Sequence, residues 1–155
     1  MSSILDTARH YHKLIGIPLA KKIMQNKLKC RNNGKSKSEC RLAVPGNFSR
    51  IGDFPFAACL ILFIGGENSI CSASLISRNR LVTAAHCWYD SDYRANSMIV
   101  MLGSLNMKDD TATRITTNDV VTHPKYDNEL VINDIAIIRL KNKITLSSKY
   151  QISIL

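Results

Sequence analysis

The sequence has 155 residues, of which 45% are hydrophobic and 21% charged, and its formal net charge is +9 at pH 7. This is enough apolar material for one globular domain with a core, and because no apolar run approaches the ~18 residues of a membrane-spanning helix, no membrane span is predicted. The positive charge is concentrated near the start, since residues 1–41 hold ten Lys and Arg against two acidic residues, whereas residues 42–155 hold eleven against ten.

Residues 1–42 are predicted to be a basic leader or pro-segment that is partly disordered, because polar, charged segments rarely bury enough apolar surface to order. Basic segments of other proteins bind nucleic acid or anionic membrane surfaces. This leader lacks interleaved aromatic residues and any recognisable nucleic-acid-binding module. Neither nucleic acid nor a membrane is therefore predicted as a partner.

Two parts of the leader have patterns of their own. Residues 1–29 have the spacing of an amphipathic helix around Leu14, Ile17 and Met24, although a proline interrupts it. The apolar stretch inside this helix is too short, and runs too directly into basic residues, to be a secretory signal peptide. Residues 30–41 are polar and rich in Asn, Ser and Lys, which predicts a linker or a loop closed by cysteines.

From Phe54 onward the pattern changes to short runs rich in Val, Ile, Leu and Thr, separated by turn residues. This spacing is typical of the strands of an all-β sandwich or barrel. Six such strands can close into a small antiparallel barrel without exposed edges. The last run contains four consecutive apolar residues, 135–138, which favours burial on both faces. The runs cover residues 56–64, 70–77, 80–84, 98–103, 114–123 and 134–140.

The five cysteines indicate an oxidising compartment, because this number is high for a chain of this length. None lies in a CxxC pair, so no zinc site is predicted. Cys59 lies within an apolar strand and is expected to be a free thiol in the core, whereas Cys30 and Cys40 are candidates to pair with each other. The remaining two are Cys71 and Cys87.

Four segments carry a specific pattern, and they follow one another in a fixed order. They are CSASLIS at residues 71–77, LVTAAHC at 81–87, HPKYD at 123–127 and NDIAIIRL at 133–140. In this order and spacing they resemble segments of the trypsin/chymotrypsin family of serine proteases, over roughly residues 43–155. The resemblance implies that these residues form an incomplete trypsin-like peptidase domain. Its fold would be the antiparallel six-stranded first barrel of a chymotrypsin-like double barrel.

The resemblance assigns His86 as the catalytic base and Asp134 as the carboxylate that orients it. The chemistry requires such a pair, because a serine hydroxyl is a poor nucleophile without an adjacent base, and histidine titrates near neutral pH. A buried carboxylate holds the imidazole in one tautomer, and serine proteases are the type case of this arrangement. By contrast, His123 has no such support and is expected to be a residue at a strand end.

The same resemblance implies a disulfide between Cys71 and Cys87, which would tie the histidine segment to the preceding strand. It also implies an extracellular, secreted protein that hydrolyses protein or peptide substrates by acyl transfer and needs no cofactor. Ser104 stands where the family has an acidic residue of its calcium loop. Neither a calcium site nor any other metal site is therefore predicted.

Three departures from the family pattern limit what the resemblance implies. First, the chain contains no GDSGG-like segment, so neither a nucleophilic serine nor an oxyanion hole can be assigned. Second, AVPG at residues 43–46 stands in place of the family's activation motif IVGG. Third, Ser72 and Ala73 replace two glycines, whose backbone freedom they lack.

We therefore expect a serine endopeptidase family member whose 155-residue chain is incomplete and inactive alone. One alternative is a non-catalytic homologue that works as a binding or regulatory module, and another is a truncated product with no stable role. In each case the face meant for the missing second barrel would present apolar surface, which promotes association.

Overall fold

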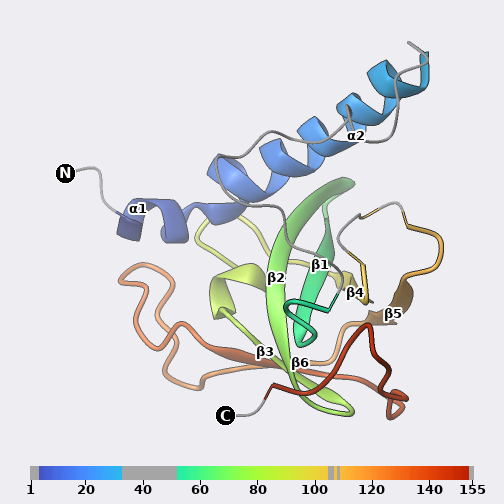
Figure 1. The fold of residues 1–155 in the computed structure, drawn as a ribbon. Coiled ribbons are helices and arrows are strands. Elements are labelled where there is room, and N and C mark those ends of the chain that lie inside the picture. The colour runs from blue at the N-terminus through green and yellow to red at the C-terminus, as the bar shows by residue number, and fades with distance from the viewer. Residues whose placement is uncertain (1–3, 33–51, 105–106, 108, 154–155) are drawn as a thin grey trace.

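The computed structural model describes residues 4–32, 52–104, 107 and 109–153, and it consists of an N-terminal helical part and a curled β-sheet (Figure 1). The helical part contains α1 (Ile4–Arg9), the π-helix η1 (His12–Gly16) and α2 (Ile17–Asn32). The sheet contains β1 (Ala57–Ile64), β2 (Glu67–Ser77), β3 (Arg80–Thr83), β4 (Ser97–Leu102), β5 (Thr113–Thr117), β6 (Val120–Thr122) and β7 (Ala136–Arg139), and the 3₁₀ turn η2 (Ala85–Cys87) follows β3.

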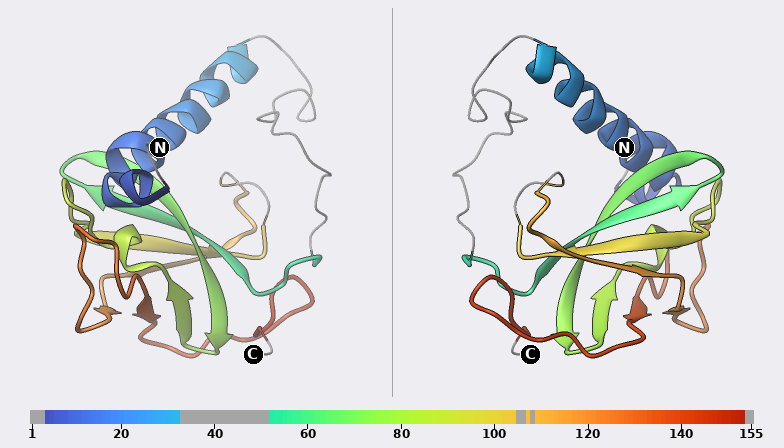
Figure 2. Two further views of the ribbon diagram at one scale, coloured as in Figure 1. Left: turned by 90° about the vertical axis from the view of Figure 1, so that its left-hand side faces the viewer. Right: turned by 90° about the vertical axis from the view of Figure 1, so that its right-hand side faces the viewer.

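All strand pairs are antiparallel, in the order β5-β4-β1-β2-β3-β7-β6. The all-β prediction is confirmed, but the predicted number of six strands is wrong. The run at residues 114–123 forms two strands, because β5 pairs with β4 whereas β6 pairs with β7. Since only two residues separate these strands at opposite edges of the sheet, the sheet must curl until its edges meet, as Figure 2 shows.

The core lies inside this curled sheet and follows the two-residue alternation of strand side chains. On β1, Leu60 and Leu62 are fully buried, whereas their neighbours on the strand are partly exposed. Strands β2, β3, β4 and β7 contribute buried side chains in the same way. These fully buried apolar residues are Leu75, Leu81, Met98, Val100, Leu102 and Ile138.

The segment that leads into β7 alternates as well, so the prediction of burial on both faces is wrong there. Ile135 is 47% exposed, whereas Ala136 and Ile138 are buried. The reason is that β7 is one strand in the wall of the curled sheet, paired with β3 on one side and β6 on the other. Only one face of β7 points into the barrel.

The helical part lies against β2 on one side of the sheet (Figures 1 and 2). The predicted apolar face of this helix is confirmed only at Ile17, which is buried. At the other two positions the prediction is wrong, because Leu14 is 52% exposed and Met24 is 47% exposed. The face that contacts the sheet contains small and polar residues too. Its buried residues are His12, Gly16, Ile17 and Ala20.

Pro18 does not end the helix, although the sequence predicts an interruption there. A proline inside a helix lacks an N–H donor, and its ring clashes with the carbonyl four residues earlier. The helix widens into η1 immediately before this point, and the Ile17 N–H bonds to the His12 carbonyl. The interruption therefore takes the form of a π-helix rather than a break.

Part of the predicted leader falls outside the described residues. This part includes Cys40, so the pairing of Cys30 with Cys40 stays a prediction, as does the leader boundary at residue 42. Among the helices that the structure describes, none combines the length and the apolar character needed to cross a membrane.

Candidate active site

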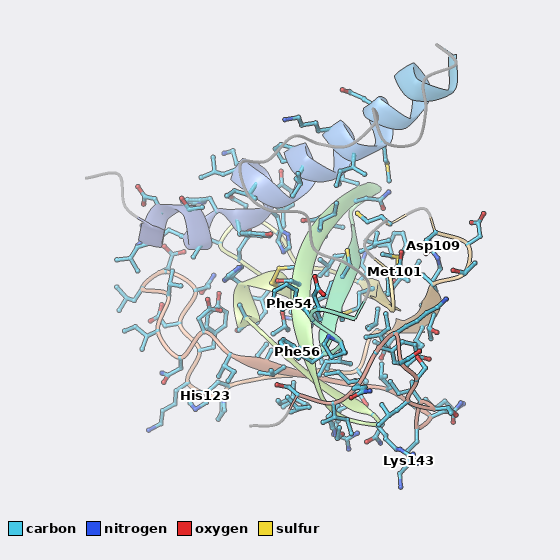
Figure 3. The ribbon with its side chains drawn as sticks, viewed as in Figure 1. Phe54, Phe56, Met101, Asp109, His123 and Lys143 are labelled. Atoms are coloured by element: carbon cyan, nitrogen blue, oxygen red, sulfur yellow. A yellow bond between two sulfur atoms is a disulfide. The ribbon has the colours of Figure 1, made fainter. Side chains whose placement is uncertain are left out.

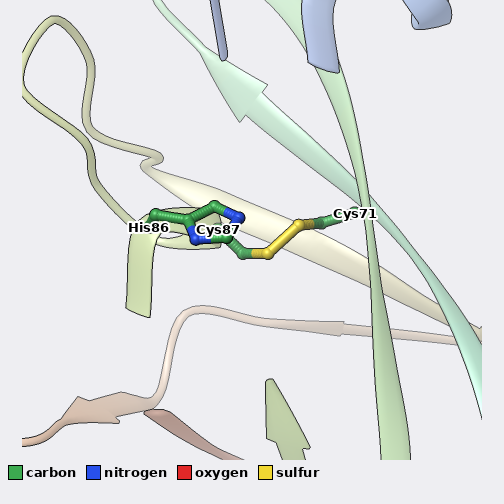
Figure 4. A group of neighbouring side chains, drawn as sticks. All are labelled: Cys71, His86 and Cys87. Atoms are coloured by element: carbon green, nitrogen blue, oxygen red, sulfur yellow. A yellow bond between two sulfur atoms is a disulfide. The ribbon is translucent and has the colours of Figure 1, made fainter. Parts of the chain in front are cut away.

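His86 lies on η2, the short turn that follows β3. A disulfide between Cys71 and Cys87, whose Cα atoms are 6.0 Å apart, joins this turn to β2. Figure 4 shows the imidazole beside this disulfide. The predicted pairing is confirmed, and it fixes the backbone of the turn on which His86 lies.

Asp134 lies just before β7 and contacts His86 with both carboxylate oxygens. Oδ2 is 2.7 Å from Nδ1 of the His86 ring, and Oδ1 accepts the backbone N–H of the same residue at 2.8 Å. The approach to β7 includes Asn133 in the left-handed region at φ 55°, which asparagine tolerates better than most residues. This turn directs Asp134 toward η2 rather than toward solvent.

The electrostatics of the pair fix its protonation. Burial raises the pKa of Asp134, but hydrogen bonds from the ring and backbone of His86, together with the charge of that ring, outweigh burial, so the pKa lies below its ordinary value. Asp134 is therefore ionised at neutral pH and can only accept hydrogen bonds. Nδ1 of His86 must then carry a proton, and in the neutral ring Nε2 has a lone pair that can accept one.

Cys71, His86 and Cys87 also place three possible metal-ligating atoms within 4.8 Å of one another. Both sulfurs are joined in the disulfide, so neither can act as a thiolate ligand. The two cysteines therefore form a cross-link between β2 and η2. Cys59 is a free thiol, as predicted, although it is partly exposed rather than part of the core, and burial raises its pKa to about 11.

His123 does not take part in this arrangement. It follows the last residue of β6, lies toward the outer edge of the molecule in Figure 3, and its Nδ1 accepts the backbone N–H of Lys125 at 3.2 Å. It is a strand-end residue, as predicted.

Two residues near His86 were missed by the sequence reasoning, and both come from the N-terminal helical part. The Tyr11 ring lies 4.7 Å from the His86 ring, centroid to centroid, at an interplanar angle of 44°. His12 is fully buried, and burial lowers its pKa, with Asp90 raising it and His86 lowering it further. No motif indicates either residue, because both lie outside the strand segments that carry the family pattern.

The Trypsin family model matches residues 43–155. This chain belongs to the trypsin family. Among curated proteins it is similar to trypsin-1 of Astacus astacus, with 29% identity over 109 residues, covering 68% of this chain and 46% of that protein. Chymase of Mus musculus is 39% identical over 97 residues, which cover 60% of this chain and 36% of the chymase.

A solved structure of HL collagenase has the same fold over the shared part. Its TM-score is 0.58 at 25% sequence identity, and the match covers 70% of this chain and 45% of the collagenase chain. The predicted family and the predicted chymotrypsin-like barrel half are thus confirmed. This chain spans less than half the length of these relatives.

Proposed function

We propose that this chain belongs to a serine-type endopeptidase, in which His86 is the general base and Asp134 orients it. The single observation that carries the proposal is the 2.7 Å contact between His86 Nδ1 and Asp134 Oδ2, together with the second carboxylate oxygen on the His86 backbone. This geometry holds the ring in one orientation and leaves Nε2 as the basic nitrogen. The proposed substrates are proteins or peptides, as for the trypsin family in general.

In the proposed mechanism, Nε2 of His86 takes the proton of a serine hydroxyl as the hydroxyl oxygen attacks the peptide carbonyl. The imidazolium that forms is stabilised by the ionised Asp134. The ring then returns the proton to the leaving amine, and water hydrolyses the acyl-enzyme. Each step uses the same two nitrogens, so the orientation that Asp134 imposes supports both halves of the reaction.

We propose that the nucleophile comes from outside the printed 155 residues. No GDSGG segment is present among them. The Ser69 hydroxyl is hydrogen-bonded to Nδ1 of His12 at 2.8 Å, and the Ser104 hydroxyl donates to the Asp109 carboxylate at 2.8 Å. Both hydroxyls therefore have hydrogen-bond partners other than His86. We therefore propose that these 155 residues alone hydrolyse no peptide or ester.

The test is labelling with a fluorophosphonate probe, which reacts with an activated serine. A longer product of the same gene that contains a GDSGG serine is expected to be labelled, at the latest once Tyr11→Ala removes the ring that lies against His86, whereas the 155-residue chain is not. His86→Ala in the longer product should abolish the label, and His123→Ala is the matched control that should retain it. Labelling that survives His86→Ala would overturn the proposed role of His86.

The missing GDSGG segment also favours a second candidate, a non-catalytic homologue that works as a binding or regulatory module. The two candidates differ in one outcome, because a longer product without a reactive serine would remain unlabelled. Both agree with an extracellular location, which the disulfide between Cys71 and Cys87 supports. Both would also leave apolar side chains available for association, among them Leu130, Ile132 and Ile135, which are 59%, 50% and 47% exposed.

A further inference from the structure

The N-terminal residues 4–25, here called the cap segment, contact the candidate active site directly although they lie outside the trypsin match. Tyr11 makes two of these contacts. Its ring lies against the ring of His86 at 4.7 Å between centroids, and its hydroxyl donates to the carbonyl of Ile70 at 2.8 Å. Ile70 precedes Cys71, so Tyr11 is fixed between the histidine turn and the strand to which the disulfide ties it.

The next residue anchors the cap segment inside the protein. The backbone N–H of His12 donates to Asp90 at 2.7 Å, and its Nδ1 lies 2.8 Å from the hydroxyl of Ser69. His12 is 0% exposed, and so is Ser69. A histidine this deeply buried, with both contacts made to the barrel part of the chain, belongs to a docked segment and not to a solvated tail.

Packing at Gly16 is close enough to require a glycine. A Cβ at this position would lie 2.0 Å from the Ser69 hydroxyl oxygen, a distance that side chains do not tolerate. Ile17 and Ala20 continue the buried face, at 8% and 2% exposure. The cap segment and β2 therefore fit one another over two turns of helix.

Polar contacts surround this packed centre on several sides. His10 Nδ1 lies 2.8 Å from the Asp92 carboxylate, and Lys21 pairs with Glu67 at 2.9 Å. Arg9 Nε donates to a backbone carbonyl at 2.7 Å. These contacts are exposed and contribute little individually, but they reach three separate parts of the chain, so they fix where the segment docks.

We propose that residues 4–25 are an intramolecular cap on the candidate active site, and that His86 becomes accessible only when this segment is displaced. Tyr11 occupies one face of the imidazole, whose side chain is 16% exposed. A peptide that approaches the ring from this side meets the tyrosine first. That the cap is inhibitory rests on the proposed peptidase function, whereas the covering of His86 does not.

The test measures the accessibility of His86 in the 155-residue chain with diethyl pyrocarbonate, which acylates histidine rings, followed by peptide mass spectrometry. Tyr11→Ala removes the ring contact, and Gly16→Val forces the helix away from Ser69. Each is expected to raise the acylation rate of His86 roughly tenfold, the change that follows from losing one well-packed contact. Leu14→Ala is the matched control, because this side chain lies on the same segment but points to solvent, and it should leave the rate unchanged.

Hydrogen exchange of residues 4–20 measures docking independently. These amides should be protected in the unmodified chain and exchange rapidly in Gly16→Val, while fluorescence of the buried Trp88, the single tryptophan, reports that the barrel stays folded. If Gly16→Val unfolds the barrel, Tyr11→Ala decides the question, because it leaves the helix packing intact.

Two results would overturn the proposal. One is an unchanged His86 rate in Tyr11→Ala and in a folded Gly16→Val, and the other is rapid exchange of residues 4–20 in the unmodified chain. Neither measurement depends on hydrolysis, so failure of the cap is distinguishable from failure of the peptidase function, which only the fluorophosphonate experiment reports.

Discussion

Replacing Asp134 with Asn is expected to reverse the protonation of the His86 ring. In the native chain the carboxylate accepts both the backbone N–H and the Nδ1–H of His86, which leaves the lone pair on Nε2. Asparagine offers one oxygen and one NH₂ group. If the oxygen stays on the backbone N–H, the NH₂ group donates to Nδ1, and the ring proton moves to Nε2. The nitrogen with the lone pair is then Nδ1, which faces residue 134 and not a substrate.

The cost in stability follows from the character of the two hydrogen bonds. Hydrogen bonds to a charged group contribute about 1.5–3 kcal/mol each, against about 0.5–1.5 kcal/mol for neutral ones. The side chains of His86 and Asp134 are only 16% and 20% exposed, so solvent screens the pair weakly. Asp134→Asn is therefore expected to lower the free energy of unfolding by about 1–3 kcal/mol near pH 7.

This loss should depend on pH in a defined direction. The folded-state pKa of Asp134 is lowered from 3.8, because hydrogen bonds from His86 outweigh the effect of burial. A carboxyl group with a lowered folded-state pKa contributes stability above its unfolded value, and this contribution is lost as the pH falls through the folded value. The difference between the native chain and Asp134→Asn should thus be complete above about pH 4 to 5 and shrink in stronger acid.

Two measurements check this prediction. Long-range ¹⁵N–¹H correlation spectra of the histidine rings report the tautomer, and urea unfolding reports the free energy. Asp92→Asn is the control, because Asp92 also pairs with a histidine at 2.8 Å, but that histidine is His10 and not His86. The reasoning is refuted if Nε2 of His86 stays unprotonated in Asp134→Asn, or if unfolding at pH 7 is unchanged.

Three further predictions concern the disulfide, the cap and the exposed apolar surface. Replacing Cys71 and Cys87 together with serine should lower the free energy of unfolding by about 3 kcal/mol in urea titrations, because the bond closes a loop of 16 residues. The cap segment should undock in acid, since burial lowers the pKa of docked His12 whereas undocked His12 takes up a proton below about pH 6.5. Hydrogen-exchange protection of residues 4–20 should therefore fall between about pH 7 and 5, and His12→Gln should remove this dependence while His10→Gln retains it. Ile135→Asp should weaken concentration-dependent association in sedimentation velocity, because it places a charge on exposed apolar surface.

The pairing of His86 with Asp134 could be predicted because each residue lies in a segment with a specific pattern, and the family fixes how these segments meet. The number of strands could not be predicted in the same way. Residues 113–117 and 120–122 are rich in β-branched side chains, so local propensity favours a strand on each side of Asn118 and Asp119. The two turn-forming residues mark the division into β5 and β6, but the pairing of these strands with different partners is a property of the curled sheet.

The docking of the cap segment could not be predicted from the local sequence either. Hydrophobic periodicity identifies the face of a helix that carries apolar residues, and here it pointed to Leu14 and Met24, which are exposed. The face that docks instead contains His12 and Gly16. A buried histidine is recognised only through its partners, and a glycine only through its close neighbour, and Ser69 supplies both of these contacts.

The cap and the His86–Asp134 pair are built from different parts of the chain, and this separation has a consequence for how the site would be regulated. The pair depends on η2, on the disulfide to β2 and on the turn before β7, all of which lie within residues 43–155, the part that matches the trypsin family. Tyr11 and His12 lie outside that match. Displacing the cap should therefore change access to the imidazole while leaving the contact between Nδ1 and Asp134 in place. In Tyr11→Ala the tautomer of His86 should remain that of the native chain while its acylation rate rises, whereas in Asp134→Asn the tautomer should change while Tyr11 stays docked. A change of the His86 tautomer in Tyr11→Ala would show that the cap also positions the histidine.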